Sequence, residues 1–328
     1  MNGKLLERLK EIKHLIGNTP THQMTNINIS GYNFFAKLES FNMLDNIKVR
    51  PAYFILEQAI KRGQIDKNTV VIESSSGNFA ISLASLCNMV GIKFIPVIDP
   101  NINPIYENLL YSLCETVIKV SDRDDTGGFL KTRLDAVRKL MDENKNSFWT
   151  NQYQNNNNYM AHYQGLGNEI GQENIHYDYV FIAVSTLGTI SGISNRIKEL
   201  SKDTKVVAVD VKGSAIFSNE TKSRYIPGIG SSINPKFLKQ SKIDDYIIID
   251  EFEGIVGCWE LMKKEGIFVG GSSGCVFSAA KKYIGKVGTN FQGNILLLFA
   301  DGGFPYIDTI YNPKWINLKY KENIKCYI

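Results

Sequence analysis

The chain has 328 residues, of which 43% are hydrophobic and 21% are charged. That composition is typical of a folded globular protein, and the length suits one large domain or two of medium size. The net charge is +4, from 37 basic and 33 acidic residues, and no run of Lys or Arg exceeds two residues. A nucleic-acid partner is therefore not expected, and the apolar stretches are too short for a membrane-spanning segment.

The N-terminal segment, residues 1–15, alternates charged and apolar residues and lacks the apolar core of a signal peptide. It is expected to form an amphipathic helix. The chain has five cysteines without a CxxC pair and four isolated histidines without metal-ligand spacing. We therefore expect reduced thiols, no metal site and a cytoplasmic location.

From residue 70 onward, short apolar runs alternate with segments of helical periodicity. Strands are expected at 70–72, 94–98, 116–120, 179–183, 206–209, 246–249 and 295–299, and helices at 78–90, 104–113, 128–144, 188–200, 252–264 and 274–284. Apolar strands separated by amphipathic helices predict an α/β protein whose parallel sheets are covered by helices on both faces.

The rhythm of strands and helices pauses near residues 147–153, which indicates a domain boundary. The Asn-rich stretch 154–158 follows and is expected to be a polar surface loop. In open α/β sheets, ligands bind beyond the carboxyl ends of the strands. The ligand is therefore expected in a cleft between two lobes.

Three turns rich in hydroxyl groups stand where a strand is expected to lead into a helix, at 75–78, 185–189 and 272–274. Hydroxyls, glycine and unpaired N–H groups at a helix N-terminus can bind an anion, a phosphate at 185–189 and a carboxylate at 75–78. Each turn by itself is also typical of an ordinary helix cap. Three of them at three strand ends favour a cleft lined with hydrogen-bond donors.

Several motifs occur in a fixed order along nearly the whole chain. They are Ile16-Gly17-Asn18-Thr19-Pro20, Ala36-Lys37-Leu38-Glu39, then Asn42, Lys48 and Arg50-Pro51-Ala52, Ser75–Asn78, Asn151-Gln152-Tyr153, Ser185–Thr189, Pro227-Gly228-Ile229-Gly230, Glu265-Gly266-Ile267 and Gly271-Ser272-Ser273-Gly274. In this order they resemble the motifs of the fold-type II pyridoxal phosphate (PLP) family that includes cysteine synthase. The resemblance implies PLP as the cofactor.

The resemblance also implies roles for individual residues. Lys48 would carry PLP as a Schiff base and act as the catalytic base. The other cofactor-binding residues would be Asn78, Ser185, Thr186, Leu187, Gly188, Thr189 and Ser272. The substrate-binding residues would be Ser75, Ser76, Gly77, Arg133, Gln152, Tyr153, Ser185 and Gly230. A guanidinium such as that of Arg133 can bind a phosphate in bidentate fashion, although the pattern alone equally fits a solvated helix charge.

The fold implied by the resemblance has two lobes, each with a mainly parallel sheet flanked by helices, and the cofactor lies in the cleft. Residues 1–44 and 150–328 would form the larger, cofactor-binding lobe. Residues 45–149 would form a smaller, mobile lobe with the substrate loop. Members of the family are commonly homodimers, so a homodimer that acts on small amino-acid substrates is expected by analogy.

Within the family, the chain most resembles enzymes that join O-phospho-L-serine to glutamate by β-replacement through an aminoacrylate. The segments that carry this likeness are 127–133, 151–153, 185–186, 210–214 and 227–230. It implies a transferase or lyase that supplies 2,3-diaminopropionate for a siderophore or a peptide natural product. The alternatives are a cysteine synthase, a cysteine-consuming enzyme that releases sulfide, and a non-catalytic PLP-binding relative. A dinucleotide-binding oxidoreductase is disfavoured because no GxGxxG follows the first strand.

The chain departs from the family pattern at four places. The usual PxGSxKDR around the lysine reads Met43-Leu44-Asp45-Asn46-Ile47-Lys48-Val49-Arg50. Leu187 replaces a small residue in the phosphate loop, where backbone N–H groups supply much of the binding. Ile233 stands where glutamate-using members carry a basic residue, which leaves the second substrate open. Asp301-Gly302-Gly303 lacks the more polar continuation that is common in the family.

Overall fold

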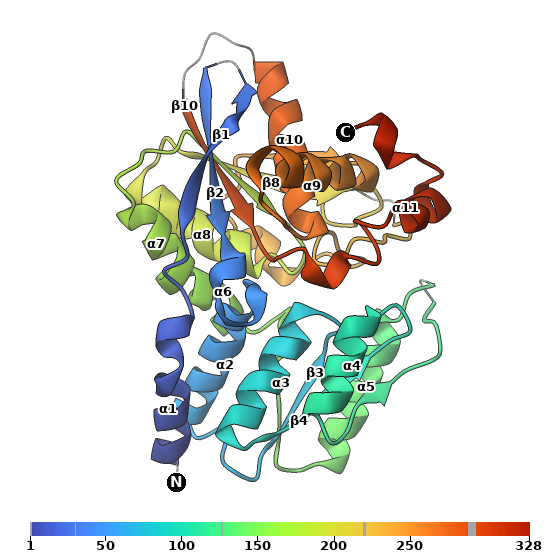
Figure 1. Cartoon of the computed structure of the whole chain (residues 1–328). Coiled ribbons are helices and arrows are strands. Elements are labelled where there is room, and N and C mark those ends of the chain that lie inside the picture. The colour runs from blue at the N-terminus through green and yellow to red at the C-terminus, as the bar shows by residue number, and fades with distance from the viewer. Residues whose placement is uncertain (1, 30, 126, 219–220, 288–292) are drawn as a thin grey trace. The chain divides into compact units, whose positions relative to one another are not determined.

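The computed structural model of the chain describes residues 2–29, 31–125, 127–218, 221–287 and 293–328 (Figure 1). The chain divides into two compact units, Met1–Gly17 with Lys48–Ala161 and Asn18–Ile47 with His162–Ile328, here called the first and the second unit. Each unit has its own sheet flanked by helices. The predicted α/β class with mainly parallel sheets is therefore confirmed.

The first unit contains a four-stranded sheet in the order β5-β4-β3-β6, and its strand pairs are parallel. The strands are β3 (Val70–Ser74), β4 (Lys93–Ile98), β5 (Ile118–Lys119) and β6 (Ser147–Trp149). The helices are α1 (Asn2–Glu11), α2 (Val49–Lys61), α3 (Asn78–Val90), α4 (Pro104–Leu113), α5 (Leu130–Glu143) and α6 (Asn156–Ala161), with the short 3-10 helix η1 (Lys13–Leu15). Helices α3 and α5 pack against the sheet.

Local sequence explains where the elements of the first unit begin and end. Helix α3 ends at Gly91, whose φ of 76° is the left-handed geometry that glycine adopts after a helix. Helix α4 starts after Asn103, whose side chain accepts a hydrogen bond from the Ile105 N–H, and Pro104 occupies its first turn. Because the strands are parallel, the loops that follow β3, β4 and β6 leave the same edge of the sheet.

The second unit contains a six-stranded sheet in the order β1-β2-β10-β7-β8-β9. The strands are β1 (Thr21–Ile29), β2 (Tyr32–Leu38), β7 (Tyr179–Ala183), β8 (Lys205–Val211), β9 (Asp245–Ile249) and β10 (Gly293–Phe299). The α-helices are α7 (Gly167–Gln172), α8 (Gly188–Leu200), α9 (Glu251–Glu265), α10 (Gly271–Val287) and α11 (Pro313–Tyr320). The shorter helices are η2 (Glu39–Phe41), η3 (Met43–Asp45), η5 (Lys236–Gln240), η6 (Phe304–Tyr306) and η7 (Ile324–Cys326), with a π-helical turn η4 (His162–Leu166).

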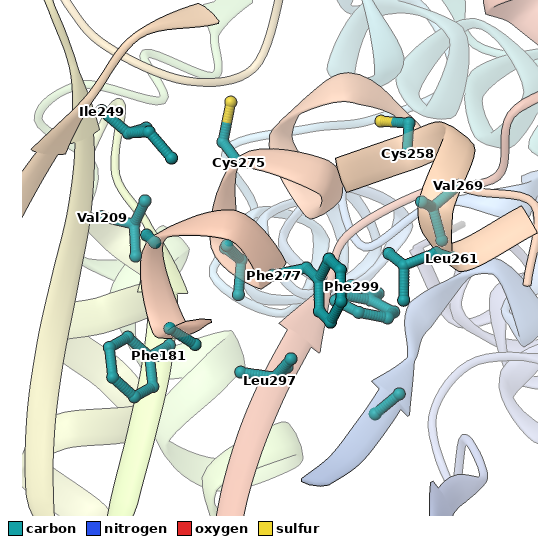
Figure 2. Close-up of a cluster of buried hydrophobic side chains, with 14 of the residues drawn as sticks. Phe181, Val209, Ile249, Cys258, Leu261, Val269, Cys275, Phe277, Leu297 and Phe299 are labelled. Carbon is teal, nitrogen blue, oxygen red and sulfur yellow. The ribbon is translucent and has the colours of Figure 1, made fainter. Parts of the chain in front are cut away.

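A hydrophobic core fills the space between this sheet and helices α9 and α10 (Figure 2). Its members include Phe181, Val209, Ile249, Leu297 and Phe299 from the strands and Cys258, Leu261, Cys275 and Phe277 from the helices. The two helices pack closely because glycines face the neighbouring helix. A methyl group at Gly254 would collide with the Cys275 sulfur, and one at Gly274 would collide with the Gly254 carbonyl oxygen. This contact fixes the start of α10, where Ser272 lies.

Two features of the fold differ from the expectations. Helix α1 packs against α2 and α3, so residues 1–17 group with the first unit, whereas the sequence assigned them to the larger lobe. Strand β1 pairs antiparallel with β2 at the edge of the larger sheet. No strand is predicted before residue 70, so this strand pair is a finding of the structure.

The prediction of a polar surface loop at 154–158 is wrong. Residues Asn156–Asn158 begin α6, and Asn158 is buried. The side-chain amide of Asn158 donates to the Gln152 carbonyl oxygen at 2.7 Å, and that of Asn155 donates to the Thr150 carbonyl oxygen at 2.9 Å. These amides satisfy buried backbone groups, which explains why asparagines stand there. Within the described parts of the chain, every helix is too short or too polar to span a lipid bilayer.

Candidate active site

The predicted substrate turn, Ser75–Asn78, joins the end of β3 to the start of α3. Ser75 is buried, while Ser76, Gly77 and Asn78 are half-buried. A methyl group at Gly77 would meet no atom within 4 Å, so the turn borders open space. The first N–H groups of α3 lie beside it, and a helix N-terminus favours an anion such as a carboxylate.

Arg133, from the first turns of α5, is held against this turn. Its Nη1 donates to the Ser76 hydroxyl oxygen at 2.9 Å and lies 3.1 Å from Oδ2 of Asp99. Asp99 follows β4 directly, and its Oδ1 accepts a hydrogen bond from the Asn101 N–H at 2.8 Å. The side chains of Arg133 and Asp99 are 14% and 9% exposed. Arg133 is therefore a half-buried guanidinium oriented by two partners rather than a solvated helix charge.

The loop with Gln152 and Tyr153 follows β6 at the same sheet edge. Gln152 is buried and Tyr153 is half-buried. The carboxylate of Glu73, on β3, accepts hydrogen bonds at Oε2 from the Thr150 hydroxyl and, at 3.3 Å, from the Gln152 N–H. Asn151 has a φ of 46°, so the chain turns sharply between these two donors. Glu73 thus joins the strand before the substrate turn to the loop that carries Gln152.

Asn78 is oriented by a neighbouring helix. The Tyr106 hydroxyl, on α4, donates to Asn78 Oδ1, and Tyr106 is buried. Because the amide oxygen accepts this bond, the amide nitrogen points the other way as a donor. A donor at this position suits the predicted role of Asn78 toward the cofactor.

Lys48 stands at the N-cap of α2 and is half-buried. In the segment before it, Leu44 and Asp45 have φ angles of 67° and 57°, a left-handed conformation that non-glycine residues rarely adopt. Asp45 occupies the place of the family's glycine. Burial and the nearby Asp301 carboxylate raise the pKa of Asp45 to about 6.

The segment after β10, residues 300–303, forms hydrogen bonds with residues 43–47, which precede Lys48 and are here called the lysine loop. It also forms one with the first turn of α10, which contains Ser272. On one side, the Ile47 N–H donates to the Ala300 carbonyl at 2.8 Å, and the Gly302 N–H donates to the Asp45 carbonyl at 3.2 Å. On the other side, the Ala300 N–H donates to the Ser273 hydroxyl at 3.0 Å. The departures from the family pattern at Asp45 and at 301–303 are therefore in direct contact with each other.

The predicted phosphate loop, Ser185–Thr189, joins β7 to α8. Leu187 has a φ of 65° and caps the helix. A left-handed residue next to right-handed ones turns consecutive N–H groups toward one point, which makes an anion-binding nest. The Thr189 hydroxyl oxygen lies 3.2 Å from Nε2 of His162, and His162 is fully buried.

Gly230 and Ser272 are both buried in the second unit. The Gly230 N–H donates to the Val184 carbonyl at 2.7 Å, which holds Gly230 beside the phosphate loop. Its φ of 76° requires glycine, and a side chain there would crowd Arg224 and Val211. Ser272 lies in the first turn of α10.

The structure thus brings Ser76 and Arg133 together, and it ties Gln152 to Glu73 and Gly230 to the phosphate loop. PLP needs an amine for its aldehyde, N–H donors for its phosphate and a partner for its ring nitrogen, and the side chains and turns described in the two units include each of these donor types. Among the described residues, no group of three or more His, Cys, Asp or Glu side chains could hold a metal ion.

Comparison with known proteins agrees with this donor set. The family of pyridoxal-phosphate dependent enzymes matches residues 12–301, and the chain belongs to it. N-(2-amino-2-carboxyethyl)-L-glutamate synthase of Cupriavidus metallidurans is 38% identical over 304 residues, which cover 92% of this chain and 89% of that protein. The predicted family, the predicted cofactor and the likeness to an N-(2-amino-2-carboxyethyl)-L-glutamate synthase are confirmed.

Solved structures share the fold. A hydrogen sulfide-producing enzyme from Fusobacterium nucleatum is 31% identical, with a TM-score of 0.83 over 89% of this chain and 96% of that one. An O-acetylserine dependent cystathionine β-synthase from Helicobacter pylori is 27% identical, with a TM-score of 0.85 over 92% of this chain and 98% of that one. The chain is thus a PLP-dependent enzyme of the cysteine synthase type.

Sequence reasoning missed Asp99, Glu73 and Tyr106, and it named residues 301–303 only as a departure from the family pattern. Two of them carried a signal: Glu73 is a carboxylate inside an otherwise apolar strand, and Asp99 follows a strand directly. A buried charge in such a strand needs a partner, which indicates a built polar site. Tyr106 and residues 300–303 act through contacts with segments that are distant in the sequence. No local pattern predicts such contacts.

Proposed function

We propose that this enzyme replaces the phosphate group of O-phospho-L-serine with the amine of a second amino acid, with glutamate as the acceptor. The observation that carries the proposal is the half-buried Arg133, which donates a hydrogen bond to Ser76 of the substrate turn. A guanidinium pairs with a phosphate through two parallel charge-assisted hydrogen bonds, whereas an acetyl group offers no such charge. The name of the Cupriavidus relative supports glutamate as the acceptor.

Recognition of the amino acid would use the two loops that Glu73 joins. The Ser75–Gly77 turn and the amide of Gln152 would bind the substrate carboxylate, and Arg133, Tyr153 and Ser185 would bind the phosphate. Gly230 would leave room for the substrate beside the phosphate loop, because it has no side chain. Binding both anionic groups at fixed positions would place Cβ and its leaving group in one orientation.

PLP, when bound, supplies the electron sink that makes the Cα–H bond of the substrate acidic. Lys48 would hold it covalently through Nζ, with Asn78, the Ser185–Thr189 loop and Ser272 as its other partners. Once displaced by the substrate amine, Lys48 Nζ would take the proton from Cα. The phosphate would leave Cβ with the bonding electron pair, and Arg133 would stabilise its charge. The acceptor nitrogen would then bond to Cβ and lose a proton to solvent, and Lys48 would return to Cα the proton that it had taken from there.

The experiment is a substrate comparison with Arg133→Gln. The purified holoenzyme is given O-phosphoserine, O-acetylserine or cysteine, with glutamate or sulfide as acceptor, and products are identified by mass spectrometry. Loss of the charged contact should lower kcat/KM for O-phosphoserine about 10- to 100-fold more than kcat/KM for O-acetylserine, which also uses the Ser76 turn but has no charge for Arg133 to bind. Arg138→Gln, an exposed arginine on the same helix, is the matched control and should change neither.

Two outcomes would contradict the proposal. Equal losses for both serine derivatives would show that Arg133 has no phosphate-specific role. Turnover with sulfide or cysteine alone would instead favour the second candidate, a sulfide-linked β-replacement, which the 31% identity to the Fusobacterium enzyme supports. A homodimer and a cytoplasmic location stay predictions from the family resemblance, and sedimentation analysis would test the first.

A further inference from the structure

Glu73 is a buried carboxyl group that the proposed chemistry does not use. It is 1% exposed and lies on β3, two residues before Ser75. Its Oε2 accepts hydrogen bonds from the Thr150 hydroxyl and the Gln152 N–H. A carboxyl group is seldom fully buried unless its contacts have a use. Here it joins the two loops that would grip the substrate carboxylate.

The surroundings of Glu73 are nearly neutral. Its partner in β4 is Pro96, and the donors that follow β6 are Thr150 and Gln152, which carry no charge. The charged group that acts on it is Arg133 from α5, which is itself paired with Asp99. Burial raises the pKa of Glu73 to about 7, while its hydrogen bonds and the Arg133 charge lower it. Burial therefore opposes the ionised form of Glu73, and the hydrogen bonds and the Arg133 charge favour it.

We propose that Glu73 is a positioning residue for the Ser75–Asn78 turn and the Gln152 loop, and that it takes up a proton when an anionic group binds at Arg133. The proton uptake rests on the proposed function, because it requires that an anion binds at Arg133. The positioning part stands on the contacts of Glu73 alone.

The positioning follows from the strand geometry. β3 and β6 are paired, with Ile72 opposite Trp149, so the backbones already run side by side. Beyond this pair, Glu73 continues the connection through its side chain to Thr150 and Gln152. Hydrogen bonds to an ionised carboxylate are stronger than those to a neutral carboxyl group. The Gln152 loop is therefore held most firmly when Glu73 is ionised.

The coupling follows from charge. The positive Arg133 favours the ionised form of Glu73, and a bound phosphate dianion would offset that positive charge. The pKa of Glu73 would then rise further, and the group would bind a proton. By linkage, the anion would bind more tightly at lower pH, where Glu73 is already protonated.

The first test is hydrogen exchange by mass spectrometry on the holoenzyme. Glu73→Gln keeps the size of the side chain but removes the charge, so the Gln152 amide should exchange about tenfold faster or more. Glu143→Gln, an exposed carboxylate at the end of α5, is the control and should not change that peptide. Unchanged exchange at Gln152 in Glu73→Gln would overturn the positioning role. Should this variant not fold, Thr150→Val, which removes one donor, carries the same expectation.

The second test is calorimetry with inorganic phosphate near pH 7 in buffers of different ionisation enthalpy. Phosphate itself ionises near this pH, so the quantity compared is the difference between the two proteins: the wild-type enzyme should take up a fraction of a proton more per phosphate bound than Glu73→Gln does. Equal uptake by both proteins would overturn the coupling. Absence of phosphate binding by the wild-type enzyme would count against the Arg133 subsite and overturn the coupling with it, whereas the exchange result would still decide the positioning role.

Discussion

At the residue scale, the polar side chains of the first unit owe their orientation to partners on other elements. Arg133 on α5 is directed by Ser76 and by Asp99, and Asn78 on α3 is directed by Tyr106 on α4. Each partner is buried or half-buried. Removing one member of such a pair leaves the other without its charge or hydrogen bond, which costs more than the contact itself contributes.

Lys48 is predicted to be the lysine that holds PLP. Borohydride reduction of the holoenzyme followed by peptide mapping should place the pyridoxyl group on Lys48, and Lys48→Ala should carry none. Lys37 provides an internal control. It is 3% exposed and its amine lies 2.8 Å from the Glu173 carboxylate, so it should stay unlabelled. A label on Lys37 or on another lysine would refute the assigned chemistry.

At the element scale, the short segment after β10 acts as a connector. It bonds to the loop before Lys48 through Ala300 and Gly302, and to α10 through Ser273. The Asp45 carboxylate lies where a Cβ at position 302 would be, so any larger residue there would have to displace this carboxylate. The lysine loop and residues 301–303 both depart from the family pattern, and they contact each other. The two departures therefore belong to one packing arrangement.

Gly302→Ala should destabilise the fold by about 1–3 kcal/mol, measured by urea unfolding, because its methyl group would collide with the Asp45 carboxylate. The double variant with Asp45→Gly should recover most of the loss, since glycine removes the carboxylate and accepts the φ of 57°. Gly285→Ala, at an exposed position on α10 with open space around it, is the control and should cost nothing. Additive losses in the double variant would show that the two positions are not coupled.

Asp45→Gly alone should show a defined pH dependence. The pKa of Asp45 is raised from 3.8 to about 6 in the folded protein, so the folded state binds the proton more tightly than the unfolded state. The stability contributed by the protonated group is complete below about pH 4 and is lost as the pH rises through 6. The variant should therefore gain stability relative to the wild type as the pH rises from about 4 to 7.

At the scale of the whole molecule, the two units interrupt each other along the chain, which changes unit after Gly17, Ile47 and Ala161. The N-terminal helix α1 therefore belongs to a unit whose remaining residues begin at Lys48. Leu5 and Leu9 on α1 are buried, and the helix packs against α2 and α3. The first unit is complete only with this distant segment.

Leu9→Ala should destabilise the first unit by about 2–5 kcal/mol, because Leu9 is fully buried. Hydrogen exchange should show lost protection in α2 and α3, with strands β7 to β10 unaffected. Lys10→Ala, an exposed neighbour, should stay within about 0.5 kcal/mol of the wild type. A loss of protection confined to α7–α10 would contradict the placement of α1.

Local sequence patterns predicted much of the secondary structure of this protein. The helices at 78–90, 104–113 and 188–200 and the strand at 179–183 begin and end where expected. Caps, periodicity and apolar runs act over a few residues, so they are visible in the sequence. The order of motifs was enough for the family and the cofactor. The phosphate loop was predicted for the same reason, since its hydroxyls and glycine are neighbours in the chain.

Tertiary structure decided which distant residues meet. The sequence could not show that Asp99 holds Arg133, that Asn158 supports Gln152, or that residues 1–17 pack with α2 and α3. These contacts form between strand ends and helices separated by tens of residues, and nothing in either segment specifies its partner. Burial is what creates the need for them, because a charge or an amide removed from water must find a hydrogen-bond partner, and only the folded chain determines which one is near.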